Sequence, residues 1–384
     1  MNEKLAIGFT VKKSSKLQVL LASALTLITS TVYAVEIEKR IILTGEILHD
    51  SNPAMVEDSK DPTWIYSLTP QFQLDAKDEV NRWYLDALLL VQRHSNEKVL
   101  IDREDPRVTV GWDRAYQSGM FGIKAGYAES SARIIELNNS GAFTNTDNTE
   151  KNKSLAGKWQ YDFAPQWSIL TEAGYNDVTY TATGLLDDYK LSEIKSKLTY
   201  EYTEKLNTYV AVGYTHFNPD NNLENTDLSR VAVGADYQIN EALTVYSRLG
   251  VHDLSGHQSK SGWDAALKAD YVADKLLYTV LLSRDFNAYG VGFRKIDSAK
   301  LTAQYKFTDN DSVGGDYSFD QYKKDNNINV GKLNAQTLGA FYERRINDHW
   351  RARLSGSHRK LDFVGSHPTS NLFGVSVVYD TLSF

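Results

Sequence analysis

The 384-residue sequence contains no cysteine, and this absence sets the first constraint on its fold. Without disulfide bonds, an exported chain must be held together by its own backbone hydrogen bonds and packing. Long apolar runs are also scarce, and the mean hydropathy of −0.42 excludes a bundle of transmembrane helices. A closed β-barrel meets both conditions, because its backbone bonds all run between strands and only every second strand residue faces lipid.

An excess of positive charge is lacking too, since the formal net charge is −7. Part of the positive charge lies in residues 1–34, which have the features of a secretory signal peptide: four lysines, the apolar segment Leu17–Ile28 and a small-x-small site at Val32–Ala34. Cleavage after Ala34 leaves residues 35–384 as a single domain with a net charge of about −10. We therefore expect no nucleic-acid partner, which would require a basic face.

Catalytic and metal-binding motifs are sparse. No Gly-x-Ser-x-Gly elbow occurs. His252, Asp253 and His257 are too loosely spaced to indicate a metal site and are interpreted as a solvated loop. The acidic segment Asp220–Glu224 lacks the glycine that a calcium loop requires. The sequence thus predicts no enzyme, no metal and no cofactor, although a barrel hydrolase with Ser and His facing lipid stays open as an alternative.

The segment Val231–Val251 shows the unit from which the chain is built. Its odd-numbered residues up to Ile239 are mostly apolar and its even-numbered ones are small or polar, and the alternation resumes after Asn240–Glu241. This pattern predicts an antiparallel hairpin with arms of about 10 residues, the length that a tilted strand needs to cross a bilayer. The register predicts that Val233, Tyr237, Val245 and Leu249 face lipid, and that Asp236 and Arg248 face water.

Similar hairpins recur along the sequence, and most carry an aromatic residue beside the short turn. Examples are Trp159–Ile169, Leu198–Tyr209 and Ala303–Val313. Aromatic residues at such positions form the girdle of a membrane barrel at the membrane–water interface. A large soluble β-sandwich is the alternative, because its strands also alternate.

The strand count predicts a transmembrane, antiparallel, up-and-down all-β barrel of about 18 strands, with 16 as the alternative. An even count places both termini in the periplasm, with short turns there and longer loops outside, and a barrel of this size can hold an aqueous channel. The expected strands are 36–48, 63–75, 81–93, 106–115, 119–129, 153–163, 167–179, 190–202, 206–217, 228–239, 242–253, 262–272, 275–285, 297–307, 311–321, 333–345, 349–360 and 371–381.

The end of the chain is expected to close the sheet and to direct its assembly. Phe373, Val375, Val377 and Tyr379 form one apolar face, and the chain ends at Phe384. Tyr379 and Phe384 resemble the β-signal that the outer-membrane assembly machinery reads. Asp380 departs from the alternation counted back from Phe384, which a bulge or a short tail would explain.

With these features the chain resembles the β-barrel porins of Gram-negative outer membranes, including those associated with exopolysaccharide operons. The resemblance rests on Glu46–Pro53, Arg103–Asp113 and Glu129–Arg133, and on the serial tyrosine-ended hairpins. It implies an outer-membrane barrel and, loosely, the export or uptake of saccharides. It implies no catalytic residue.

Charged residues on the polar face of each strand are the candidates for the pore lining. The cations gather in the last third of the chain, where the arm Trp350–Lys360 carries no acid, and this indicates a local strip that attracts anions. A lumen whose charges simply pair is the alternative. The candidates are Arg230, Arg248, Lys300, Lys306, Arg345, Arg351, Arg353, Arg359, Asp86, Asp113, Glu172 and Asp236.

The longest link, Ser130–Lys153, is expected to fold inward and narrow the pore. Its apolar run makes little sense in a loop that contacts only solvent. The constriction candidates are Ile134, Ile135, Glu136, Leu137 and Asn138. The alternative is an external tip that packs on neighbouring loops.

These observations predict a porin-like channel for small polar or acidic solutes, with saccharides as one class. Two alternatives stay open: a barrel component of an exopolysaccharide secretion system, and a surface adhesin or receptor barrel without a transport role. The expected partners are outer-membrane lipid and lipopolysaccharide, the assembly machinery, and a polysaccharide or periplasmic secretion partner.

Overall fold

The computed structural model describes residues 35–57, 61–97, 100–133, 148–181, 186–220, 225–256, 260–289, 292–323, 333–363 and 365–382. The strands are β1 (Glu36–Asp50), β2 (Thr63–Lys77), β3 (Asn81–His94), β4 (Arg103–Tyr116), β5 (Gly119–Ser131), β6 (Thr149–Ala164), β7 (Trp167–Tyr180), β8 (Tyr189–Thr203), β9 (Leu206–Pro219), β10 (Thr226–Gln238), β11 (Leu243–Gly256), β12 (Lys260–Val272), β13 (Leu276–Tyr289), β14 (Gly292–Lys306), β15 (Asp311–Tyr322), β16 (Leu333–Arg345), β17 (Trp350–Asp362) and β18 (Thr369–Asp380).

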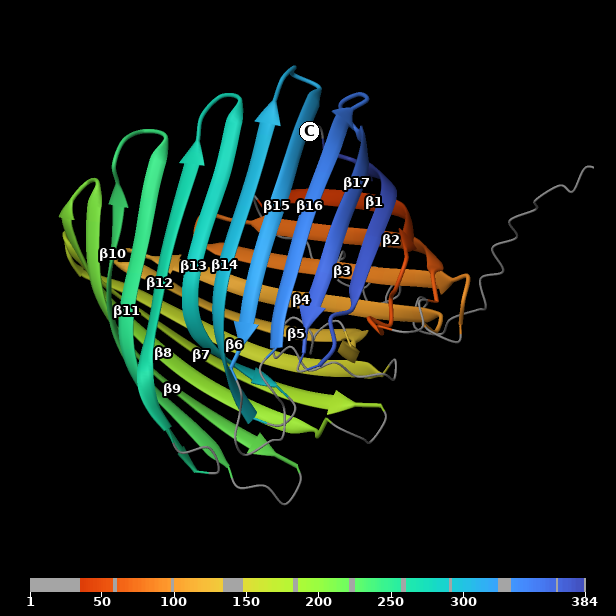
Figure 1. Cartoon of the computed structure of the whole chain (residues 1–384). Coiled ribbons are helices and arrows are strands. Elements are labelled where there is room, and N and C mark those ends of the chain that lie inside the picture. Colours follow the sequence, from red (N-terminus) through yellow and green to blue (C-terminus); the bar gives the residue numbers. More distant parts are fainter. Residues whose placement is uncertain are drawn as a thin grey trace, which may run out of the picture.

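The strands form one closed antiparallel sheet. Each strand pairs with the next along the chain, and β1 pairs with both β2 and β18, so the 18-stranded sheet closes into a barrel. In Figure 1 the green-to-blue strands form the near wall, and the red-to-yellow strands cross behind them. The predicted fold class is therefore confirmed. Within the described ranges, no helix is long and apolar enough to cross a membrane.

The outer face is identified by its large apolar side chains that remain exposed. In β10, Val231 and Val233 are 49% and 54% exposed, whereas Ala232 between them is only 4% exposed. The predicted register of this hairpin is confirmed, because Val233 pairs with Leu249 and Tyr237 with Val245. The odd-numbered residues of β10 and β11 thus face outward, and the even-numbered ones face the lumen.

The strands are longer than expected. They run from 12 to 16 residues instead of the expected 10 to 13, because their pairing continues beyond the apolar band. The largest correction concerns residues 286–296, which the strand assignment left as a loop. Residues 286–289 continue β13 and residues 292–296 belong to β14, and Ala288 pairs with Phe293.

The even-to-odd connections are short turns, and β1 begins and β18 ends at the same end of the barrel. At the turn between β2 and β3, hydrogen bonds from the Asn81 side chain and from the backbone of Val80 and Asn81 hold the pKa of Asp78 below its ordinary value. Outward-facing rings near these turns contact one another in an unbroken series. Its members are Trp159, Tyr161, Phe163, Trp167, Tyr200 and Tyr202. This series matches the predicted girdle and marks the periplasmic interface.

The seam between β1 and β18 decides between the two explanations of Asp380 in favour of a short tail, because β18 ends at this residue. Asp380 continues the alternation of β18 without a bulge and faces inward, where it is 1% exposed. Its carboxylate accepts a hydrogen bond of 2.9 Å from Arg40 Nε on β1 and a second from Arg40 Nη2. The residue therefore joins the two ends of the barrel wall by an ion pair. Tyr379 faces outward, 4.9 Å from the Trp350 ring, and Phe384 lies outside the described residues.

The motifs that carry the resemblance reach the loop end of the barrel, where Asp50–Pro53, Arg103–Asp105 and Glu129–Arg133 lie. Asn52 is fully buried, and its Nδ2 donates to the carbonyl oxygens of Val56 (2.7 Å) and Thr369 (3.0 Å). Hydrogen bonds from Ser366 and from the His367 backbone lower the pKa of Glu57, so the loop after β1 is also bound to the connection before β18.

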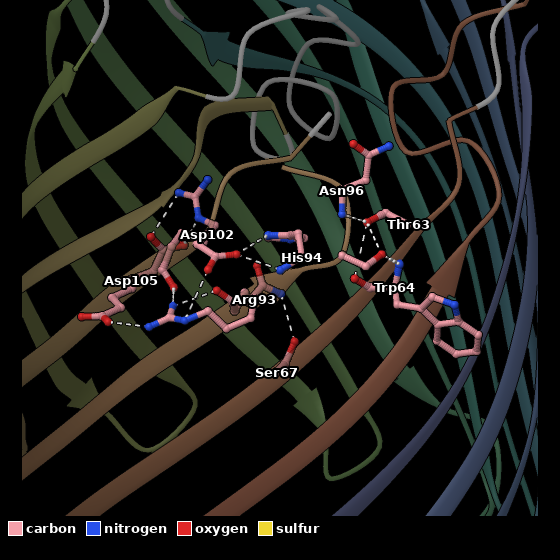
Figure 2. A network of polar contacts seen from close by, with 12 residues as sticks. Thr63, Trp64, Ser67, Arg93, His94, Asn96, Asp102 and Asp105 are labelled. Carbon is pink, nitrogen blue, oxygen red and sulfur yellow. Dashed lines mark hydrogen bonds and ion pairs between the residues drawn. The ribbon is translucent and has the colours of Figure 1, made fainter. Parts of the chain in front are cut away.

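The connection between β3 and β4 is held at the same rim by a polar network (Figure 2). Arg93 Nη2 donates to Glu104 Oε1 at 2.9 Å, and the backbone N–H of His94 donates to Asp102 Oδ1 at 2.8 Å. Beside them, Arg103 forms a buried ion pair with Asp105, with 2.6 Å between Nε and Oδ2. These contacts stabilise the conformation of the chain at the rim of the barrel.

Candidate functional site

The charged candidates from the sequence all occupy strand positions whose side chains point into the barrel. Asp236 alternates with the exposed Tyr237, and Lys300 with the exposed Leu301. The same holds for the other candidates, each of which lies on the face opposite to the exposed apolar side chains of its strand. The lumen is therefore the only large polar surface that the described strands enclose, and it is the candidate functional site.

Several of these charges are matched by a neighbour on the inner wall. Lys158 Nζ lies 3.0 Å from Asp113 Oδ1. Asp86 accepts hydrogen bonds from the amides of Gln71 (2.9 Å) and Gln73 (3.1 Å). The charge of Asp113 is therefore offset by Lys158, whereas Asp86 is hydrogen-bonded by neutral amides and keeps its negative charge.

The tip of the β13–β14 hairpin folds inward and narrows the loop end of the lumen. β12 pairs with β13 only from Ala265 and Arg284 toward the turn, so residues 285–289 have left the wall and pair with β14 alone. Phe286 and Ala288 instead pack in an apolar cluster with residues of the opposite inner wall. The hairpin tip thus lies against the lumenal side of the wall.

The apolar cluster that receives the hairpin tip is built from the inner face of β7 to β11. The rings of Phe217 and Phe293 lie 5.8 Å apart, and Phe217 also contacts Tyr189 at 5.0 Å. Between the hairpin and the wall lies a cavity of about 370 Å³, lined by residues that include Asn176 and Lys195. The loop end of the lumen is therefore partly filled by the protein itself.

The cluster also contains Ala132, which is fully buried next to the end of β5. Ala132 begins the connection that was expected to narrow the pore. The constriction candidates Ile134–Asn138 themselves lie outside the described residues. The described element that enters the lumen is the β13–β14 hairpin, which the sequence analysis did not identify.

An ion network fastens the base of this hairpin to the wall. The Asp285 carboxylate bridges two arginines, at 2.7 Å to Arg230 Nη2 and 2.8 Å to Arg248 Nη2. Both arginines also face the fully buried Asp264, at 3.6 Å from Arg230 Nε and 3.3 Å from Arg248 Nη2. The network replaces the backbone bonds that β12 and β13 do not make here, and its two arginines are balanced by two carboxylates.

His252 lies in the same network and corrects a second expectation. Its side chain is buried rather than solvated, with Nδ1 3.7 Å from Asp264 Oδ1 and its ring 4.3 Å from the Phe286 ring. His257 and residues 221–224 lie outside the described residues. Among the residues that are described, no group of three or more His, Asp or Glu side chains is placed to hold a metal ion.

We call the inward arginines of β16 and β17 the arginine strip: Arg345, Arg351, Arg353 and Arg359. On the inward positions of β16 and β17, these four arginines face one carboxylate, Glu343, whose Oε1 lies 3.9 Å from Arg351 Nη1. Arg353 also stacks on the ring of Phe341, at 3.6 Å from its centroid.

Comparisons with known proteins find the same architecture in solved structures. OccAB4 of Acinetobacter baumannii superposes with a TM-score of 0.52 at 11% identity, over 90% of this chain and 98% of that one. OccK2 (OpdF) of Pseudomonas aeruginosa gives 0.53 at 10% identity, over 91% and 98%. The outer membrane protein opdK of the same species gives 0.51 at 12% identity, over 91% and 99%. No family model matches the sequence, and no curated protein matches it.

At these identities the likeness concerns the fold, and it extends over nearly the whole barrel. Together with the apolar outer face and the aromatic girdle, it defines the class of the chain, which is an outer-membrane β-barrel.

Proposed function

We propose that this barrel is a non-catalytic, porin-like channel for small polar solutes that favours acidic ones, including acidic saccharides. The proposal rests on the arginine strip, where four inward cations share β16 and β17 with one inward carboxylate, Glu343; Glu46 and Asp50 of β1, which lie near Arg353 and Arg359, offset part of this charge. Charges inside a narrow lumen with low-dielectric walls act at short range and are weakly screened. A wall of this kind raises the local concentration of anions.

Aromatic rings beside lumenal cations support the saccharide part of the proposal. Arg353 stacks on Phe341, and Lys268 Nζ lies 5.2 Å from the Tyr246 ring centroid. Tyr246 is on the inner face and is 37% exposed. An apolar ring next to a cation offers a sugar a stacking surface and offers its carboxylate a counter-charge.

Reversal potentials in planar bilayers would test the anion preference. Across a salt gradient, the parent channel should be anion-selective, and Arg351→Gln combined with Arg353→Gln should move the reversal potential toward cation selectivity. The matched control is Lys151→Gln with Lys153→Gln, which removes the same charge from the outward face of β6. A cation-selective parent, or a parent that the arginine substitutions leave unchanged, would contradict the proposed role of the strip.

Liposome swelling would test the saccharide class separately. Glucuronate and glucose are of similar size, so a higher rate for glucuronate reports its charge. The rate advantage should disappear in the double arginine variant. Absence of any conductance or swelling would instead favour an adhesin or a secretion component.

A further inference from the structure

A second cluster of cations lies on the opposite side of the wall, facing outward near the loop end. Arg284 of β13 has the outward parity of its strand, Lys323 follows β15 on the same face, and the Lys295 side chain of β14 reaches the outward ring of Trp263. The backbone N–H of Lys323 donates to the Lys295 carbonyl at 3.0 Å, so the two lysines are neighbours. We call Arg284, Lys295 and Lys323 the outer cation cluster.

One carboxylate organises this cluster without neutralising it. Asp297 accepts two hydrogen bonds from Arg284, at 2.6 Å from Nε and 3.0 Å from Nη2, and lies 2.8 Å from Lys323 Nζ. Its local charge of −1 is opposed by three cations. Lys295 instead lies 5.7 Å from the Trp263 ring centroid, and Arg284 stacks on the same ring at 4.0 Å.

The position of Trp263 places the cluster at the outer membrane interface. Trp263 is the fourth residue of β12 from its loop end, is 49% exposed, and faces outward. An outward tryptophan at this level is typical of the interfacial belt, where the apolar part of the ring meets lipid and the polar groups meet headgroups. The adjoining cations therefore lie at headgroup height on the external side.

Two other outward lysines near the loop end are each matched by a carboxylate. Lys190 pairs with Asp220 (3.3 Å) and Lys153 with Asp177 (3.9 Å). An excess of cations facing lipid is costly unless the surroundings provide anions. In the external leaflet of a Gram-negative outer membrane, the phosphates of lipid A provide them.

We infer that Trp263 and the outer cation cluster form a binding site for a phosphate of lipid A in the external leaflet. The cations would bind the phosphate oxygens, with Arg284 held in orientation by Asp297, while the Trp263 ring contacts the sugar and the upper acyl chain. This site is separate from the lumen and does not depend on the channel proposal.

Native mass spectrometry of the detergent-purified barrel would test the site. The parent should bind bisphosphorylated lipid A and bind fully dephosphorylated lipid A much more weakly. Lys295→Gln with Lys323→Gln should raise the dissociation constant about 25-fold, because each lysine near an anionic lipid contributes about fivefold. Asp297 keeps its two bonds from Arg284 in this variant, so no carboxylate is left without a partner.

Three results would overturn the inference: equal binding of dephosphorylated lipid A, equal loss of binding in the control Lys151→Gln with Lys153→Gln, or displacement of lipid A by millimolar inorganic phosphate. Heat-modifiable mobility on gels shows whether each variant is folded. If the double variant does not fold, Lys295→Gln alone, which leaves the Asp297 pairs intact, should weaken binding about fivefold. Unchanged binding in that variant would also refute the site.

Discussion

Asp285 is the residue on which the position of the inward hairpin depends most. Its carboxylate bridges Arg230 and Arg248 at 2.7 and 2.8 Å, across the gap where β13 leaves β12. Asp285→Asn keeps the shape of the side chain but removes its charge and half of its acceptor capacity. Both arginines would then share Asp264 alone.

The magnitude follows from the burial of these groups. Removing one partner of a fully buried ion pair costs about 3–5 kcal/mol. The Asp285 side chain is 34% exposed, so a loss of about 2–3 kcal/mol is the reasonable expectation here. Because each 1.4 kcal/mol is a factor of ten, the ratio of docked to released hairpin should fall by about 30- to 150-fold.

Single-channel recording would detect the release. The variant should show a larger mean conductance and more frequent transitions between levels than the parent, since the hairpin narrows the loop end of the lumen. Asp316→Asn is the control, because it removes one inward carboxylate from β15, away from the ion network. Equal conductance in Asp285→Asn and in the parent, or an equal change in Asp316→Asn, would refute the role of the hairpin as the constriction.

Two further predictions concern the stability of the barrel. Asp380→Ala should destabilise the folded barrel by about 1–3 kcal/mol, because it leaves Arg40 without its partner across the closing seam; a lower urea midpoint of heat-modifiable mobility would show this. Val233→Arg should cost about 2–4 kcal/mol if the residue lies near the midplane, whereas Asp236→Asn on the lumenal face of the same strand should change stability by less than about 0.5 kcal/mol. Equal costs for the last two variants would contradict the assigned faces.

The barrel could be predicted because its determinants are local. Alternation has a period of two, so Val233 and Asp236 reveal their faces without knowledge of any other strand. The turn-side aromatics and the even strand count are equally visible in the sequence. The short tail after Asp380 was one of the two explanations that the sequence offered, whereas its partner Arg40, on the first strand, could not be identified from the alternation.

The inward hairpin could not be predicted in this way. Residues 285–289 alternate in the same manner whether the strand stays in the wall or leaves it. Their position depends on Phe286 contacting His252 and on Asp285 reaching Arg230, contacts between strands that are distant in sequence. The sequence did contain a usable signal for the ion network. Asp264 and Asp285 occupy inward positions of β12 and β13, close to the inward arginines of β10 and β11.

The local balance of cations and carboxylates decides how the lumen should act on a solute. By parity alone, Arg230 and Arg248 count as lumenal cations, yet Asp264 and Asp285 cancel them at contact distance. The acidic total of the chain is a poor guide as well, because a charge acts on a solute in the pore only within about a Debye length, which is about 8 Å at physiological salt. In the arginine strip, four cations share β16 and β17 with one inward carboxylate, and Glu46 and Asp50 of β1 offset part of their charge. A solute that passes this wall experiences the strip at short range, and this is why a channel in an acidic protein should favour anions.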